Sequence, residues 1–331
     1  MFLVQLTLLV LMPFSIFAKA PQELTVYTSR KTHLIEPLFE AYSKKTGVKI
    51  NHINGKAGAL IQKLKQEGVK TPADLLVTVD AGNLAFAAEQ GLLSKITSKA
   101  LLSGVNKKNR GEDDKWLGLS LRARTIFYNK KLVKKEELKS YQDLADKKWL
   151  GRLCLRTSRK VYNQSLVAAM IKRIGEKETK KVVTGWVKNL EKPVFTSDTQ
   201  LLEAINKGIC QVGIANTYYL ARLIKKGEAK NVDIFWPAEN QGGVHVNVSG
   251  AGIIRESKNQ KAAVKFLEWL ITKEAQEIFA GLNDEYPVIK GVKVSKILEK
   301  WGPFKRETTP LTSIGKLQKK AVLLMDAAQY R

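Results

Sequence analysis

The chain has 331 residues, 44% of them hydrophobic, which is enough for two domains or one large one with a packed core and argues against disorder. The formal net charge of +25 favours anionic ligands, chelates or membrane surfaces. Its lysines are spread over helical segments such as 130–139 and 221–231 rather than gathered with aromatic residues, so we do not expect nucleic acid as a partner.

Residues 1–20 are mostly apolar and end in small residues, a pattern typical of a secretory signal peptide. The first residues contain no lysine or arginine, and cleavage fits after either Ala18 or Ala20. A membrane anchor is the alternative, but the stretch is short and Pro13 interrupts it. The sequence has no second apolar run long enough to span a bilayer, so we expect an exported, soluble protein without stable membrane insertion.

The first part of the mature chain alternates between strand and helix patterns. Repeated strand–helix–strand units predict an α/β domain with a largely parallel sheet. Ligands of such sheets bind beyond the carboxyl ends of the strands, here near 27–30 and 79–83. The expected strands are 23–30, 48–54 and 73–80, and the expected helices are 32–47, 58–68 and 81–93.

A long apolar run at 116–133 is expected to cross into a second domain, and 245–256 is expected to cross back. The strand–helix alternation is repeated between the two crossings, and one helix at 259–281 is expected after the second. A domain interrupted by another gives two lobes around a cleft, which is the architecture of a binding protein. The expected signal peptide is 1–20, the first lobe is 21–122 with 246–300, and the second lobe is 123–245 with 301–331.

The two cysteines, Cys154 and Cys210, each lie in a short apolar run typical of a strand. An exported protein allows a disulfide, which we expect if the two strands are neighbours in one sheet, and two buried thiols are the alternative. The sequence has no nucleophile–base pattern, P-loop or dinucleotide fingerprint, and its three histidines lack metal-ligand spacing. We therefore expect no enzymatic activity.

Tyrosines follow several of the predicted strands. Tyr218 and Tyr219 come directly after the strand 209–216, at the expected start of a helix. Neighbours inside a helix point about 100° apart, but in the first turn of a helix that opens onto a cleft both hydroxyls can meet one ligand. Tyr162 and Tyr27 also lie near strand ends. Each alone is more often a packed aromatic residue, but their shared position favours a common ligand.

A phenolate is a hard anionic donor that suits Fe³⁺, whereas zinc and copper prefer histidine or cysteine. A free phenol has a pKa of about 10, and a trivalent cation displaces its proton. Three phenolates would balance the charge of Fe³⁺ and leave coordination positions for water or a small anion. Arg30, Arg122 and Arg124 lie where forked guanidinium donors could hold such an anion.

Seven stretches of the chain resemble the periplasmic ferric-iron-binding proteins, the solute receptors of Fe³⁺ ABC transporters. The resemblance runs over nearly the full mature length and implies a class II periplasmic-binding-protein fold, with two α/β lobes around a ligand cleft and two crossing hinge strands. It also implies a monomer in the periplasm, an inner-membrane permease as partner, and Fe³⁺ held by Tyr162, Tyr218 and Tyr219. The stretches are "ELTVYTSR", "PADLLVTVDAGNL", "LRARTIFYN", "VYNQSLVAAMI", "ANTYYLARL", "VNVSGAGI" and "EYPV".

The sequence departs from many of these relatives just after the first strand. They have a histidine, or a histidine–tyrosine pair, where this chain has Lys31 and Thr32, and others have a glutamate where this chain has Val79. Protonated lysine is a poor ligand for iron. The resemblance therefore implies the subgroup with three tyrosines and a synergistic anion, which we expect to be carbonate.

The expected anion holders are Ser29, Arg30 and Arg122, and Tyr27 is a fourth candidate ligand. Two alternatives remain: Arg30 pairs with Asp80 instead, and Tyr27 packs beside the site or in the core. Whether the cargo is free iron or a chelate is open. The alternative function is a receptor for a bare oxyanion such as phosphate or sulfate, with a basic surface protein that binds nucleic acid or lipid as a more distant one.

Overall fold

The computed structural model describes residues 22–191 and 193–331, so the predicted signal peptide at 1–20 lies outside the described residues. Within these residues, all named strands belong to one nine-stranded sheet. They are β1 (Glu23–Thr28), β2 (Lys49–Asn54), β3 (Leu75–Thr78), β4 (Leu117–Asn129), β5 (Leu153–Cys154), β6 (Val212–Asn216), β7 (Val232–Phe235), β8 (His245–Ile253) and β9 (Tyr286–Pro287).

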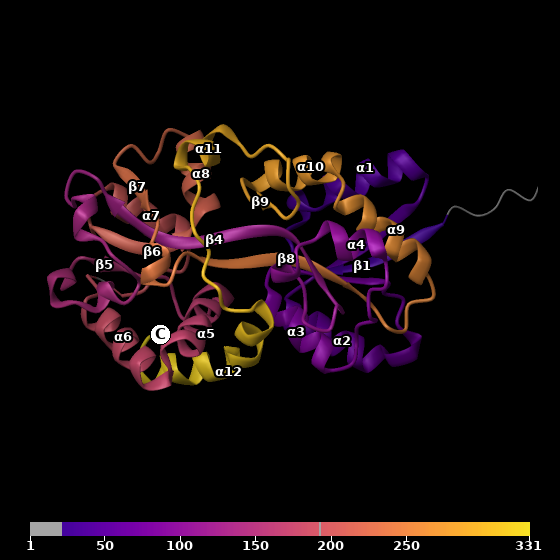
Figure 1. Ribbon diagram of the computed structural model, residues 1–331, viewed down its shortest axis with the longest axis horizontal. Coiled ribbons are helices and arrows are strands. Elements are labelled where there is room, and N and C mark those ends of the chain that lie inside the picture. The colour runs from indigo at the N-terminus through magenta and orange to yellow at the C-terminus, as the bar shows by residue number, and fades with distance from the viewer. Residues whose placement is uncertain (1–21, 192) are drawn as a thin grey trace, which may run out of the picture.

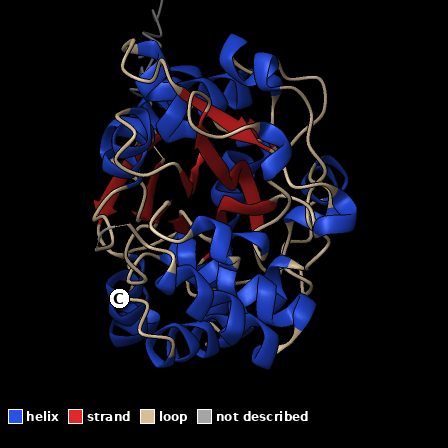
Figure 2. Ribbon diagram, turned by 90° about the vertical axis from the view of Figure 1, so that its left-hand side faces the viewer, coloured by secondary structure: helices blue, strands red, loops and turns tan. Residues whose placement is uncertain are grey.

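Helices cover both sides of the strands (Figure 2). The helix predicted at 32–47 forms over Glu36–Thr46, buries Leu38, Phe39 and Tyr42, and ends at Gly47, whose φ of 73° favours glycine. The helices are α1 (Glu36–Thr46), α2 (Ala57–Glu67), α3 (Ala81–Glu89), α4 (Lys99–Gly104), α5 (Val161–Ile174), α6 (Glu176–Lys188), α7 (Asp198–Asn206), α8 (Thr217–Lys225), α9 (Gln260–Leu270), α10 (Lys273–Asn283), α11 (Lys296–Trp301) and α12 (Leu311–Ala327).

The molecule consists of two α/β lobes, which confirms the predicted fold class (Figure 1). The first lobe contains β1 to β3, α1 to α4, α9 and α10, and the second contains β5 to β7 and α5 to α8. The strands β4 and β8 run through the middle from one lobe to the other and pair antiparallel with each other. The predicted lobe boundaries at 122 and 245 fall within or beside these shared strands, and they stay a prediction.

The sheet order β2-β1-β3-β8-β4-β6-β5 places the crossing strands at its centre. Strands β1, β2 and β3 are parallel, and so are β5 and β6. In this register Arg124 of β4 lies opposite Asn216 of β6 on one side and His245 of β8 on the other. The carboxyl ends of β1, β3 and β6 therefore meet near the crossing strands, where a ligand site is expected.

Two predicted elements differ from the structure. The single helix expected at 259–281 is divided into α9 and α10, because Thr272 caps α10: its Oγ1 accepts from Ala275 N at 3.4 Å. The apolar run around Cys154, predicted as a strand over 151–158, is limited to the two residues of β5. The predicted disulfide is confirmed: Cys154 in β5 and Cys210, just before β6, are bonded, with their Cα atoms 5.9 Å apart.

The helix α12 returns after both lobes are complete and packs against α3 of the first lobe and α5 of the second (Figure 1). Its buried face includes Leu311, Ile314, Ala321 and Leu324. Over residues 22–191 and 193–331, no helix combines the length and the apolar character that a membrane crossing needs.

Candidate metal centre

A cavity of about 170 Å³ lies between the two lobes and contains the predicted tyrosine cluster. Tyr162 is the second residue of α5, and Tyr218 and Tyr219 are in the first turn of α8. The structure thus brings three of the four tyrosines proposed from the sequence to one place. The lining residues are Ser29, Arg30, Lys31, Leu34, Val79, Arg122, Tyr162, Tyr218, Tyr219, Arg222, Asn283 and Glu285.

The adjacent tyrosines owe their geometry to the way α8 begins. Asn216 precedes the helix in an extended conformation, so the first turn starts directly at the end of β6. The rings of Tyr218 and Tyr219 lie with their centroids 4.4 Å apart. Tyr218 is only 4% exposed, and its hydroxyl oxygen accepts a hydrogen bond from Asn216 Nδ2 at 3.1 Å.

The two adjacent tyrosines resist ionisation in the metal-free protein. Burial raises the pKa of Tyr218 well above its ordinary value, and the negative charge of an ionised Tyr162 or Tyr219 would raise it further. Burial also raises the pKa of Tyr219, with Tyr162 and Asp198 acting in the same direction and Arg156 against them. Tyr218 and Tyr219 thus keep their protons until a strong positive charge arrives.

Three guanidinium groups surround these phenols. The Arg122 guanidinium lies 5.3 Å from the centre of the Tyr162 ring, and Arg222 lies 5.2 Å and 5.4 Å from the rings of Tyr218 and Tyr219. Arg156 donates to the Tyr219 hydroxyl at 3.3 Å. The site is therefore positively charged as well as phenolic, which is a poor environment for a bare cation and a good one for a cation paired with anions.

Arg122 has unused hydrogen-bonding capacity. It is buried, its Nη2 donates to Val248 O at 3.3 Å, and within the described residues its Nε has no hydrogen-bond partner. Burial acts to lower the pKa of Arg122, but the oxygens of Tyr162, Tyr218 and Glu285 outweigh it and raise the pKa on balance. This guanidinium stays charged and can donate to a further acceptor.

Arg30 and Ser29 also line the cavity. The alternative that Arg30 pairs with Asp80 is wrong: it forms a two-pronged ion pair with Glu285, at 3.1 Å and 3.2 Å, and also donates to Ser249 Oγ and Leu34 O. Most hydrogen-bond donors of the Arg30 guanidinium are therefore already used in these contacts. The Ser29 hydroxyl accepts from Val79 N at 3.3 Å and still faces the cavity.

The structure does not bring Tyr27 or Arg124 to the cavity. The side chain of Tyr27 packs in the hydrophobic core, and its hydroxyl donates to Glu67 at 2.8 Å. Burial, together with the Glu67 charge, raises the pKa of Tyr27 to about 12. Strand alternation alone does not say which face of a strand a side chain takes, and Tyr27 lies in the core, outside the lining of the cavity. Arg124 is buried behind the tyrosines, in contacts described below.

Sequence reasoning missed several residues of the site. Glu285 lies within the quoted "EYPV" stretch, but its partner Arg30 is 255 residues away, and nothing local signals such a pair. Arg222 follows Tyr218 and Tyr219 by one helical turn, and this spacing does predict that it shares their helix face. Arg156 and Asn283 carry no comparable signal.

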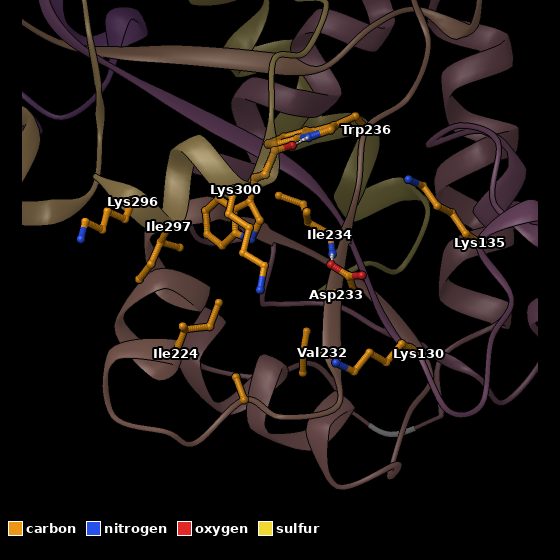
Figure 3. A pocket seen from close by; sticks show the side chains of 12 residues that line it. Lys130, Lys135, Ile224, Val232, Asp233, Ile234, Trp236, Lys296, Ile297 and Lys300 are labelled. Carbon is orange, nitrogen blue, oxygen red and sulfur yellow. Dashed lines mark hydrogen bonds between the residues drawn. The ribbon is translucent and has the colours of Figure 1, made fainter. Parts of the chain in front are cut away.

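A larger cavity of about 660 Å³ lies elsewhere, against β7, the end of α8 and α11 (Figure 3). Apolar side chains form much of its lining, and Trp236 Nε1 donates to Trp301 O at 3.0 Å. Its single carboxylate, Asp233, accepts from Ile234 N. Across 22–191 and 193–331 no three His, Cys, Asp or Glu side chains are grouped as a metal site. Of these two cavities, the tyrosine cavity is the one that gathers several hard oxygen donors.

Residues 28–277 match the family of bacterial extracellular solute-binding proteins, and the chain belongs to that family. Among its relatives, "Iron uptake protein A1" of Synechocystis is 40% identical over 94% of this chain and 88% of its own length. The "Fe(3+)-binding periplasmic protein" of Serratia marcescens is 28% identical over 94% of this chain and 91% of its own.

Solved structures agree with this placement. The Trichodesmium protein IdiA (FutA), determined with iron and citrate ligands, superposes with a TM-score of 0.88 at 40% identity, over 93% of this chain and all of that one. The iron-free FutA2 of Synechocystis gives a TM-score of 0.88 at 35% identity, over 94% of this chain and 99% of its own. The resemblance to ferric-iron-binding proteins is thereby confirmed.

Proposed function

We propose that this protein is a periplasmic receptor that binds Fe³⁺ through Tyr162, Tyr218 and Tyr219 and delivers it to an inner-membrane ABC permease. The observation that carries the proposal is the convergence of these three phenols in one cavity between the lobes. Phenolate is a hard donor, and three of them neutralise a ferric ion. The names of the relatives from Synechocystis and Serratia marcescens support ferric iron as the cargo.

An anion is expected to bind together with the iron. Three phenolates cancel the charge of Fe³⁺, so the guanidinium charges of Arg122 and Arg222 would remain unbalanced in a closed site. Both line the cavity, and neither forms an ion pair with a carboxylate in the described part of the chain. We propose carbonate, held by Arg122 and Ser29, while Arg30 contributes its charge and keeps Glu285 in place.

The protein's own chemistry is limited to coordination and release. As the iron arrives, each phenol loses its proton and the oxygen becomes a ligand. Closure of the lobes then removes the site from water, which strengthens the attraction between phenolate and metal. Release requires the reverse: opening of the lobes, loss of the anion and reprotonation of the phenols.

A visible absorption spectrum tests the proposal. Iron is supplied as ferric nitrilotriacetate in carbonate-free buffer, and bicarbonate or citrate is then added. We expect a tyrosinate-to-iron charge-transfer band that saturates at one iron per chain and needs the added bicarbonate. A band that forms equally well without bicarbonate or citrate would contradict the role of the anion, and no band under any condition would contradict the phenolate site.

Substitutions of single tyrosines identify which hydroxyl groups produce the charge-transfer band. We expect Tyr162→Phe to lose most of the ferric affinity, because it removes one of three anionic oxygens and leaves the ring in place. Tyr27→Phe is the matched control: it also removes a buried hydroxyl, but that hydroxyl contacts Glu67 and lies outside the cavity. The control should bind iron with an unchanged band.

A receptor for a bare oxyanion is the second candidate, because Ser29, Lys31, Arg122 and Arg222 line the same cavity. Such a receptor would bind phosphate or sulfate without iron, and Tyr162→Phe would leave that binding nearly unchanged. Calorimetric titration of the iron-free protein with either anion separates the two functions. Heat of binding without iron, retained in Tyr162→Phe, would favour the oxyanion receptor over the ferric one.

A further inference from the structure

The side chain of Arg124 connects three separate segments directly behind the tyrosines. It is 1% exposed and extends from β4, one of the two strands that cross between the lobes. A buried guanidinium is costly to desolvate, and an apolar residue of the same volume is often no worse for stability. Its contacts are with Asp198 Oδ2 at 3.0 Å, Asn216 Oδ1 at 3.2 Å, Asn163 Oδ1 at 2.5 Å and Ile214 O at 3.1 Å.

The contact with Asn216 decides which end of that amide faces the site. A guanidinium only donates, so it must meet the amide oxygen, and the NH₂ group is turned the other way. That group donates to the hydroxyl oxygen of Tyr218 at 3.1 Å. Arg124 thus ensures that Tyr218 receives a hydrogen bond at the oxygen proposed to bind iron.

The contact with Asp198 also helps to place a hydrogen-bond donor at the hydroxyl of Tyr219. Asp198 Oδ2 lies 3.6 Å from Arg156 Nη1, and this nitrogen donates to the Tyr219 hydroxyl at 3.3 Å. Arg156 Nε donates to Thr196 O, which fixes the plane of the guanidinium. Asp198 is fully buried and lies between Arg124 and Arg156, so the contact with Arg124 holds the carboxylate in place beside Arg156.

The contact with Asn163 holds the start of the helix that carries Tyr162. Its Oδ1 accepts from Arg124, and its Nδ2 donates to Arg156 O at 2.7 Å and Thr157 O at 3.0 Å. These two carbonyls belong to the turn between β5 and α5. The first turn of α5, with Tyr162, is therefore fixed relative to Arg124.

We propose that Arg124 is a positioning residue for the tyrosine site: it orients the donors that act on the oxygens of Tyr218 and Tyr219 and fixes the helix start that presents Tyr162. The inference rests on the proposed ferric function. A hydrogen bond donated to a coordinated phenolate stabilises its filled orbitals, so it raises the energy of the phenolate-to-iron charge transfer. The network should therefore set the colour and the affinity of the iron site, beyond any effect on folding.

Three substitutions in the full mature protein test this inference. Asn216→Asp keeps an acceptor for Arg124 but has no donor for Tyr218, and Asn216→Leu removes the same donor without adding charge. We expect both to move the charge-transfer band to longer wavelength and to lower ferric affinity roughly 10- to 100-fold. Arg124→Lys keeps the charge but cannot reach all three segments, and we expect it to shift the band and weaken binding as well.

Asn189→Asp is the control for the cost of a buried charge. Asn189 is buried in the second lobe and donates to Leu144 O and Asp146 O, outside the tyrosine cavity. The Asn189→Asp substitution should lower the melting temperature and leave the charge-transfer band of the iron-loaded protein unmoved.

The outcomes separate the two proposals. A coloured wild type with an unshifted band and affinity in Asn216→Asp, Asn216→Leu and Arg124→Lys overturns the role of Arg124 and leaves the ferric site standing. A colourless wild type overturns both. If Arg124→Lys fails to fold, as judged by circular dichroism, the two Asn216 variants still decide the question.

Discussion

Lys225 and Asp284 form an ion pair between the two lobes, with Lys225 Nζ 2.7 Å from Asp284 Oδ2. Lys225 is in the last turn of α8, the helix whose first turn carries Tyr218 and Tyr219, and Asp284 directly follows α10 of the first lobe. Arg222, one turn earlier in α8, donates to Asn283 beside it. The second half of the helix that holds two of the proposed ligands is therefore joined to the opposite lobe at Arg222 and Lys225.

Loss of this ion pair should speed up iron release. Lys225→Gln removes the cation that faces Asp284, whose side chain is 2% exposed, so the two lobes lose a favourable contact with each other. Because Lys225 itself is half exposed, we expect an effect of about 1 kcal/mol or less, or up to about fivefold in the dissociation rate. Stopped-flow transfer of iron to a chelator, followed by loss of the visible band, measures it.

Lys226→Gln is the matched control, since it removes the same charge from the next residue of the chain. Lys226 is exposed, and its side chain has no ion pair within 22–191 and 193–331. A rate increase of equal size in both variants would show that net charge, rather than the contact between lobes, governs release.

Iron binding should release protons. Burial holds the pKa of Tyr218 well above its ordinary value and raises that of Tyr219, so both phenols are protonated at neutral pH before iron arrives. Coordination removes these protons, and ferric affinity should therefore rise as pH rises. Titration in weakly buffered solution with an indicator dye counts the protons, with ferric chelate alone as the blank. Tyr162→Phe should release one proton fewer than the wild type, and equal release would argue against Tyr162 as a ligand.

The iron-free protein should lose stability at alkaline pH. Burial raises the pKa of both Tyr27 and Tyr128 to about 12, whereas the unfolded chain has values of about 10. Between these two values the unfolded state loses protons that the folded state keeps, so the free energy of unfolding falls as pH rises. Urea midpoints measured from pH 9 to pH 12 test this. Tyr27→Phe should show a shallower decline, and an identical decline would contradict the assignment to that phenol.

The disulfide should contribute strongly to stability. It joins Cys154 and Cys210, which are 56 residues apart in sequence, and the chain-entropy relation for a loop of this size gives about 4 kcal/mol. The double variant Cys154→Ser with Cys210→Ser should therefore have a clearly lower urea midpoint under oxidising conditions. Added reductant should lower the midpoint of the wild type and leave that of the double variant unchanged. A wild type insensitive to reduction would contradict the expected contribution.

Local signals predicted much of the fold. The alternation of strand and helix patterns identified β1 to β3 and the helices between them, because each of these elements has its own apolar periodicity. The division between α9 and α10 was missed, since apolar spacing continues across Thr272 and only its capping contact interrupts the helix. The short β5 was overestimated because an apolar run does not reveal how many of its residues find a strand partner.

The candidate site was predictable where it depends on strand ends and not where it depends on distant contacts. Tyr162, Tyr218 and Tyr219 lie at the starts of helices that follow β5 and β6, which their order in the chain already indicates. The network around Arg124 joins segments up to 92 residues apart, and the Arg30–Glu285 pair spans 255 residues. Tertiary packing alone decides these partners, so a single sequence carries no sign of them.

The last residues of the sequence have a practical bearing on how the protein is handled. After α12 the chain returns to the turn that precedes α5: Tyr330 Oη donates to Arg156 O at 2.5 Å, and Ser158 N donates to Arg331 O at 3.3 Å. An affinity tag fused after Arg331 would disturb these two hydrogen bonds and, through them, the turn that supports Tyr162 and Arg156. Preparations intended for spectroscopy of the proposed iron site should therefore avoid a tag at this position.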